Sequence, residues 1–135
     1  MGWVTRLFGL EPKNYGQYYV YALIDPRNQK PFYLGKGTKN RMYQHRKEME
    51  TLMKKGNPGS MMALSCKHKR ILEILDAGYT DIEYEVLYRT DEEGDAYRAE
   101  RHYIENYGIE RLTNETYGLT DRAIDRLIQR RLGRR

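Results

Sequence analysis

The chain has 135 residues, a net charge of +5 at pH 7 and one cysteine. This length predicts a single domain with a modest core, and one cysteine excludes both a disulfide framework and a cysteine-based zinc site within one chain. Neither a membrane-length apolar run nor a secretory leader is visible, so we expect an intracellular protein, cytoplasmic or nucleoid-associated (nuclear in a eukaryote), and its mild basicity favours a polyanionic partner.

Residues 1–14 precede the first predicted strand and include Trp3 and Phe8. We expect an N-terminal arm that packs on the domain or on a partner, with an unstructured start as the alternative. The predicted division is an arm over 1–14, a core domain over 15–118 and a basic helix over 119–135.

A hairpin is predicted near the start of the core domain. Aromatic and β-branched residues favour a strand over Tyr18–Ile24, Asp25–Asn28 is a proline-containing turn, and Phe32–Leu34 forms the returning strand. Because strand side chains alternate, one face carries Val20, Ala22 and Ile24, and the other carries Tyr19, Tyr21 and Leu23. Tyr21 and Tyr33 are therefore expected to be neighbours on one face.

Polar groups gather directly after the second strand. Gly35 and Gly37 bracket Lys36 in a predicted loop, where glycine lets the backbone approach a ligand and the lysine supplies positive charge. Arg41 and His45 lie four residues apart on the following helix and share a face. We expect the two phenols, the lysine, the arginine and the histidine to converge on one spot.

Two helices are predicted next, over 40–55 and 61–77, with a glycine- and proline-containing break at 56–60. Thr38 or Asn40 is expected to cap the first helix, and Gly78 ends the second. The first helix carries a methionine stripe typical of core packing, formed by Met42, Met49 and Met53.

The second helix has an apolar side and a basic side. The apolar side consists of Leu64, His68, Ile71, Leu72 and Leu75, and the basic side of Lys67, Lys69 and Arg70. The basic side is either a nucleic-acid contact or an ordinary solvated face. Cys66 and His68 form a metal site only if two further ligands come from elsewhere.

Residues 81–90 alternate and predict a third antiparallel strand. Its two faces are expected to carry Ile82, Tyr84, Val86 and Tyr88 against Glu83, Glu85 and Leu87. A helix over 91–106 follows, with acidic residues in its first turn that suit the helix dipole. The predicted architecture is an α+β fold, in which helices flank a small three-stranded antiparallel sheet.

Glu100 falls in the apolar sector of the helix over 91–106, which is otherwise formed by Ala96, Tyr97, Tyr103, Ile104 and Tyr107. A carboxylate on the inward side needs a compensating partner, because burying a charge costs several kcal/mol. The partner is a metal ion, an arginine or a tyrosine hydroxyl. From the helix alone, a buried Glu–Arg pair or a solvent-reaching glutamate is the ordinary reading.

The last helix, over 121–132, is expected to be capped by Thr120 and has an apolar stripe beside a basic face. Arginines recur on that face at Arg122, Arg126, Arg130 and Arg134. Contact with phosphates is the favoured role, ahead of a soluble terminus and of a membrane-surface element.

Several of these motifs occur together in a known family. Tyr19-Val20-Tyr21 followed by Tyr33-Leu34-Gly35, then Arg41 and His45, resembles the GIY-YIG nuclease family. The tighter pattern FYLGKG at 32–37 is most similar to the branch of LEM-domain, ankyrin-repeat nucleases and their stand-alone microbial and viral relatives. The chain departs from the pattern at Tyr19, where the family usually has glycine.

The second half of the chain extends the resemblance to about residue 118. Residues 96–100, 107–110 and 112–114 resemble the part of the family in which a helix glutamate binds a divalent metal and a later asparagine braces the site. Glu100 and Asn114 match those positions. The resemblance therefore implies one Mg²⁺, or Mn²⁺, held by Glu100.

The implied activity is metal-dependent hydrolysis of DNA, with branched DNA suggested by the branch and RNA left open. Tyr21 would be the general base, with His45 as a relay or as the base itself, while Arg41 stabilises the transition state, Tyr33 binds the phosphate or the water, and Asn114 orients its neighbours. Expected DNA contacts are Lys36, Lys39, Lys67, Lys69, Arg122, Arg126 and Arg130. The alternatives are a non-cleaving nucleic-acid-binding module of the same fold and an adaptor that acts through its termini.

Overall fold

The structure is a computed structural model that describes residues 15–54 and 64–133. The arm predicted over 1–14, the break at 56–60 and the first residues of the helix predicted from 61 lie outside the described residues.

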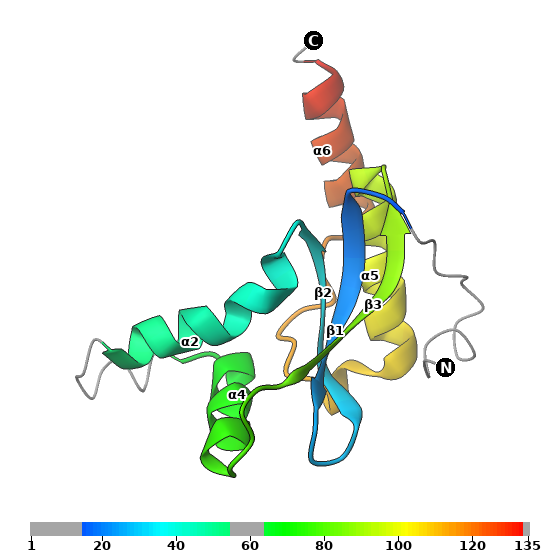
Figure 1. Cartoon of the computed structure of the whole chain (residues 1–135). Helices are drawn as coiled ribbons and strands as arrows, with labels where there is room; N and C mark the ends of the chain where they lie inside the picture. Colours follow the sequence, from blue (N-terminus) through cyan, green and yellow to red (C-terminus); the bar gives the residue numbers. More distant parts are fainter. Residues whose placement is uncertain (1–14, 55–63, 134–135) are drawn as a thin grey trace.

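Three antiparallel strands form one sheet in the order β2-β1-β3 (Figure 1). The strands are β1 (Tyr18–Asp25), β2 (Lys30–Thr38) and β3 (Glu83–Thr90). β1 is the central strand and is buried from its second residue onward, so its near-continuous apolar sequence reflects cover on both faces. Together with the helices, this sheet confirms the predicted α+β fold.

The turn between β1 and β2 is fixed by Asp25. Its carboxylate accepts hydrogen bonds from the backbone N–H of Arg27 at 2.9 Å and from the guanidinium of the same residue. These bonds hold the pKa of the Asp25 carboxyl below its usual range. Gln29 takes a positive φ of 61° and brings the chain back into β2.

β2 is longer than predicted, because the two glycines belong to the strand and not to a loop. Gly35 pairs with Tyr21, and Gly37 pairs with Tyr19. A side chain at Gly37 would come within 3.2 Å of the Tyr19 ring. The glycines therefore give space to the large rings on the neighbouring strand. Glycine is typical of turns, so the sequence suggested a loop at a place where the sheet is regular.

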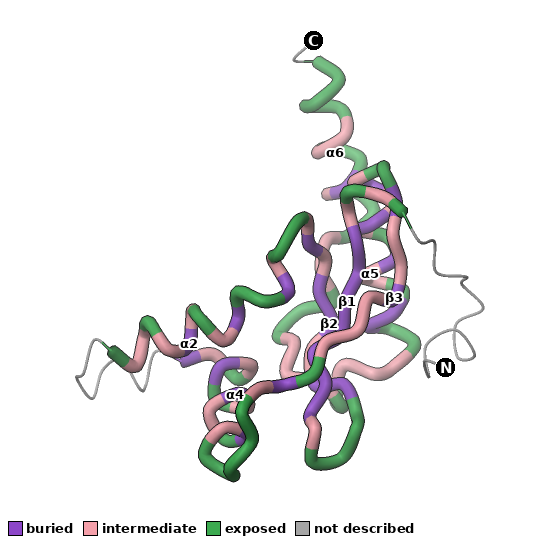
Figure 2. Tube along the Cα trace, in the orientation of Figure 1, coloured by how far each residue is buried: buried purple, intermediate pink, exposed green. Residues whose placement is uncertain are grey.

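Different helices cover the two faces of the sheet (Figures 1 and 2). The two core clusters confirm the predicted alternation of β1. α5 (Glu93–Tyr107) packs on the face formed by Val20, Ala22 and Ile24. On the other face, Tyr19, Tyr21 and Leu23 share a buried cluster with residues of α2 (Gln44–Lys54) and α4 (Cys66–Asp76).

The segment from β2 to α2 begins with a short 3-10 turn, η1 (Arg41–Tyr43). Neither predicted cap is made by a side chain, since Asn40 occupies the cap position without a capping hydrogen bond. The buried side chains of Met42 and Met49 confirm the methionine stripe as core. On α4, the hydroxyl of Ser65 accepts a hydrogen bond from the His68 N–H, so the helix starts at Cys66.

A β-bulge corrects the predicted faces of β3. The register with β1 shifts between Val20 and Tyr21, so that Val20 faces Tyr88 while Tyr21 faces Val86. Tyr88 consequently packs with Leu87 on the α5 side, whereas Val86 lies on the opposite side. An inserted residue reverses the alternation beyond it, and the composition of the strand gives no sign of this.

α6 (Asp121–Leu132) begins at the predicted cap, with the Thr120 hydroxyl accepting from the Ala123 N–H at 3.1 Å. Ile124 is buried, and a side chain at Gly94 of α5 would collide with Ile128, so the start of α6 packs closely on the start of α5. The helix then projects away from the sheet (Figure 1). The short turn η2 (Ile109–Arg111) links α5 to the segment before α6. No helix in the described part of the chain has the length and apolarity needed to cross a bilayer.

Candidate active site

Tyr21, Tyr33 and His45 form a compact cluster on the α2/α4 face of the sheet. The ring centroids of the two tyrosines are 6.3 Å apart, and the imidazole lies 5.7 Å from Tyr21 and 5.2 Å from Tyr33. The hydroxyl of Tyr21 and Nε2 of His45 share a short hydrogen bond. The expected pairing of the two phenols is therefore present, and a histidine joins it.

Gly35 makes this cluster possible. A Cβ at this position would lie 2.8 Å from the Tyr21 hydroxyl and 2.9 Å from the Tyr33 ring. Tyr21 on β1 and Tyr33 on β2 therefore lie over the backbone of Gly35, which has no side chain to displace them. Any side chain at Gly35 would push at least one phenol out of place.

Burial keeps the members of the cluster uncharged. Removal from water raises the pKa values of Tyr21 and Tyr33 above that of a free phenol. Burial, reinforced by the positive charges of Lys67 and Arg41, lowers the pKa of His45 to about 3. At neutral pH the site therefore contains two phenols and a neutral imidazole.

Arg41 reaches the cluster from η1. Its Nη1 lies 2.9 Å from Oε1 of Glu48, and its charge lowers the pKa values of both phenols, opposing the effect of burial. The guanidinium is the cation best placed to favour a phenolate at Tyr21. Arg41 and His45 thus act on one spot, as their spacing predicts.

Glu100 lies on α5 but reaches the exposed edge of β2. Its carboxylate accepts a hydrogen bond from the backbone N–H of Lys36, and its charge acts on both Tyr21 and Tyr33. It lines one hollow together with Arg41. The charge of Glu100 therefore influences the phenols around the edge strand, although α5 and the phenols lie on opposite faces of the sheet.

The Glu100 carboxyl is largely removed from water, and burial raises its pKa to about 7. No arginine of the described residues forms an ion pair with it, so the alternative of a buried Glu–Arg pair is not observed in residues 15–54 and 64–133. A side chain at Gly118 would stand 2.6 Å from its Oε1. Glu100 is thus held in a close-fitting cradle without a compensating guanidinium.

Asn114 completes the edge of β2. Its Oδ1 accepts from the Leu34 N–H at 3.0 Å, and its Nδ2 donates to the Leu34 carbonyl at 2.8 Å. The N–H of Thr113 donates to the Phe32 carbonyl at 2.6 Å. The segment before α6 therefore pairs with the outer backbone groups of β2, which supports the bracing role predicted for Asn114.

We predict that Asn114→Ala destabilises the domain by roughly 2–3 kcal/mol, because two backbone groups of an edge strand lose their partners. Urea unfolding followed by circular dichroism measures the change. Asn106→Ala is the matched control, because its amide bonds only within α5 on an exposed surface. If both variants lose the same free energy of unfolding, the contacts of Asn114 with the edge of β2 do not stabilise the domain.

Lys36 does not join the cluster, contrary to the expected convergence. Its Nζ pairs with Oε2 of Glu93 at 2.8 Å and lies 4.4 Å from the centre of the Tyr97 ring, on the α5 face. Because Lys36 is on β2 between two residues of the phenol face, strand alternation sends its side chain to the other side. The ammonium of Lys36 is already paired with Glu93. A contact of Lys36 with DNA stays a prediction.

Tyr19, which stands where the GIY-YIG pattern has glycine, has a clear structural role. Its hydroxyl donates to the Lys39 carbonyl at 2.7 Å and accepts from the Met42 N–H at 3.2 Å. The buried ring therefore ties the end of β2 to η1, the turn that carries Arg41.

The other basic residues named from the sequence lie at different distances from the cluster. The Nζ of Lys67 stands 4.7 Å from the centre of the Tyr33 ring, so this lysine belongs to the site rather than to an outer face. Lys39 and Lys69 are exposed. Exposed arginines on α6 are Arg122, Arg126 and Arg130. Their contacts with DNA stay predictions.

The paired aromatic strands, the arginine–histidine helix start and the inward glutamate occur in one recognised domain. Residues 18–131 match the family model described as the LEM-3-like GIY-YIG domain. The chain belongs to the LEM-3-like GIY-YIG family. Comparisons with curated proteins and with solved structures gave no match. Membership confirms the resemblance read from the sequence and places the chain in a nuclease family, whose substrates are nucleic acids.

GIY-YIG nucleases generally depend on a divalent metal, and the residues present fit one. Glu100 is a carboxylate whose burial calls for a cation, and it sits beside a hollow rather than under packed side chains. One carboxylate suits Mg²⁺, which keeps most of its waters and takes few protein ligands.

Two residues near the GIY-YIG site were missed by sequence reasoning. Glu48 binds Arg41 and lies three residues after His45, so helical spacing alone places it on the same face. Gly118 cradles Glu100 with a φ of 88°. Its position before a capped helix looked like an ordinary connector, and no local signal indicated its contact with α5.

Proposed function

We propose that this GIY-YIG domain is a metal-dependent endonuclease that hydrolyses phosphodiester bonds in DNA. One observation carries the proposal: Glu100, half-buried and without an arginine partner among the described residues, lies close enough to Tyr21 and Tyr33 for its charge to raise the pKa of both phenols, and Tyr21 is bonded to His45. A structural domain has no need to bury an acid in that position, whereas phosphodiester hydrolysis needs a base and a concentration of positive charge at one point.

Tyr21 is the group proposed to take the proton from the attacking water, and His45 holds its oxygen. Arg41 stabilises the phenolate form and the negative charge that builds on the phosphate. Tyr33 lies beside both and is proposed to bind the phosphate or the water. Asn114 is a positioning residue, because it acts by fixing the backbone of β2 next to Tyr33.

Glu100 is the proposed ligand of Mg²⁺ or Mn²⁺. A divalent ion there supplies Lewis-acid charge to the scissile phosphate. The carboxylate also binds the Lys36 N–H, which fixes its direction relative to the strand that carries Tyr33. The chain therefore positions its metal ligand through backbone, not through a second side chain.

Two hollows adjoin the site along the edge of β2 and support a nucleic-acid path. One is lined by Lys39, Arg41 and Glu100, and the other by Tyr33, Lys67 and Asn114. The cations in them suit phosphates on either side of the scissile bond. A branched duplex is the proposed substrate. RNA is the alternative substrate, and a non-cleaving binding module is the alternative function.

The proposal is tested with supercoiled plasmid, a linear duplex, a branched duplex and a matched RNA, each incubated in Mg²⁺ and in EDTA. We expect cleavage of DNA in Mg²⁺ only, fastest on the branched duplex. Binding of DNA without any cleavage supports the non-cleaving module. Cleavage that persists in EDTA contradicts the metal-dependent account.

The affinity for Mg²⁺ is expected to depend on pH through Glu100. Its pKa of about 7 means that protons compete with the ion below neutrality, so the apparent affinity falls about tenfold per pH unit below pH 7 and levels off above it. Isothermal titration between pH 5.5 and 8.5 measures the profile. A flat profile across this range would place the ion elsewhere.

A further inference from the structure

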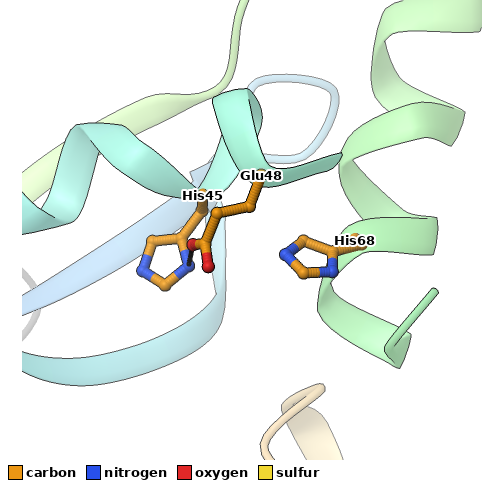
Figure 3. A group of neighbouring side chains, drawn as sticks. All are labelled: His45, Glu48 and His68. Carbon is orange, nitrogen blue, oxygen red and sulfur yellow. Dashed lines mark ion pairs between the residues drawn. The ribbon is translucent and has the colours of Figure 1, made fainter. Parts of the chain in front are cut away.

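Two histidines and a glutamate face one another across the helical pair α2 and α4 (Figure 3). His45 and Glu48 come from α2, three residues apart, and His68 comes from the facing side of α4. One ligand atom of each lies within 4.8 Å of the other two. Two of the three histidines of the chain thus meet at one point.

Three of the four ring nitrogens of this cluster have no hydrogen-bond partner among the described residues, the exception being Nε2 of His45. Nδ1 of His45 is buried and unpaired, as are both ring nitrogens of His68. The side chain of His45 is fully buried, and its Nδ1 points away from the Tyr21 bond toward Glu48. Buried polar atoms are almost always satisfied in native proteins, so three unpaired nitrogens at one spot indicate a missing partner.

We propose that His45, Glu48 and His68 bind a Zn²⁺ ion. Two imidazole nitrogens and one carboxylate oxygen are a donor set that zinc uses in sites with an open fourth position. Nδ1 of His45 and Oε1 of Glu48 are 3.6 Å apart, near the roughly 3.4 Å that separates ligands around tetrahedral zinc. The ligand atom of His68 lies within 4.8 Å of both, so closing the site requires it to move toward them.

The surroundings favour a transition metal over Mg²⁺. Arg41 shares Oε1 of Glu48, and Lys67 lies on α4 next to His68, so the cluster carries more positive than negative charge. A hard cation gains little from such a site, whereas imidazole binds Zn²⁺ strongly. Glu48 and His68 also line an open hollow between α2 and β3, which provides a path from solvent.

Bound zinc would join α2 to α4 and fix the orientation of His45. Coordination at Nδ1 leaves the ring proton on Nε2, so His45 donates to the Tyr21 oxygen. The ion is distinct from the one proposed at Glu100, and its binding does not depend on the nuclease proposal.

The test uses the full chain, stripped of metal with EDTA and dialysed, then titrated with Zn²⁺ alone. Bound zinc is measured by equilibrium dialysis with elemental analysis, Co²⁺ substitution gives the visible spectrum of a four-coordinate site, and thermal unfolding reports stabilisation. The first variant is His68→Ala. Because His68 is buried and its replacement could disturb the fold, the second variant is Glu48→Gln, at a residue whose side chain is 43% exposed. The controls are His102→Ala on α5 and Cys66→Ser at the exposed start of α4.

We expect one zinc ion per chain, a higher melting temperature with zinc, and affinity reduced by roughly 100-fold or more in His68→Ala and Glu48→Gln. His102→Ala and Cys66→Ser retain the wild-type affinity. The proposal is overturned if the chain takes up no zinc at micromolar concentration, if both cluster variants bind as well as wild type, or if Cys66→Ser removes binding. None of these measurements involves DNA, so they are independent of the test of cleavage.

Discussion

Glu100→Gln is expected to abolish DNA cleavage and, at the same time, to make the metal-free protein more stable at pH 8. Glutamine keeps the size of the side chain and an oxygen for the Lys36 N–H, but it carries no charge to hold Mg²⁺. The gain in stability arises because the folded state raises the pKa of this carboxyl from 4.5 to about 7. Its charged form therefore costs free energy in the fold.

The sign of this effect sets its pH dependence. Above pH 7 the carboxylate is charged in both states and the full cost applies, roughly 1–3 kcal/mol, whereas below pH 4.5 both states are protonated and the cost disappears. Urea unfolding of wild type and Glu100→Gln at pH 8 and pH 4 measures the difference, and plasmid nicking measures activity. Glu105→Gln, on an exposed part of α5, is the control. A variant that is less stable than wild type at pH 8 would contradict the buried-charge account.

Tyr21→Phe is expected to lower the rate of cleavage by about 10²–10⁴-fold, the range for loss of a general base. The ring and its packing are kept, so the fold and DNA binding should change little. Because burial raises the pKa of Tyr21, we also expect the wild-type rate at saturating Mg²⁺ to increase with pH from 6 to 9 and the variant rate to be flat. Single-turnover nicking over that pH range measures both effects.

Tyr19→Phe is the matched control for Tyr21→Phe. It removes a phenol from the same face of β1, where the two rings lie 5.7 Å apart, but its hydroxyl serves the backbone of Lys39 and Met42. We expect a less stable protein with near-normal cleavage. If Tyr19→Phe reduces the rate as much as Tyr21→Phe, the loss reflects packing of the hairpin and not proton transfer.

Periodicity was enough to predict the hairpin, the third strand and the faces of β1, because each depends on local alternation. Periodicity failed where tertiary structure changes the alternation of side chains or the extent of a strand. The bulge opposite Val20 moved Tyr88 to the other face, and pairing with Tyr19 and Tyr21 turned the glycine loop into strand. Neither feature has a local signature in the sequence.

The sequence was enough to predict which residues belong to the site, but not how they are arranged in the fold. Glu100 was predictable because an acid interrupts an apolar sector of its helix. The effect of its charge on the two phenols arises around the edge of β2, which only the fold reveals. Lys36 was misplaced for the same reason, since its proximity in sequence to Gly35 does not overcome strand alternation. The meeting of His45 with His68 depends on the packing of two helices and has no signature in either one.

The central claim is that a divalent ion held by Glu100 lies beside Tyr21 and Tyr33. Mn²⁺ titration, followed by NMR of ¹³C-labelled tyrosine rings, tests it directly, because the paramagnetic ion broadens only nearby signals. The experiment uses His68→Ala, which removes the second proposed metal site, with and without Glu100→Gln. We predict broadening of Tyr21 and Tyr33 before that of the exposed Tyr79, and its loss when Glu100 is replaced. Broadening that survives Glu100→Gln, or that spares both Tyr21 and Tyr33, would contradict the account.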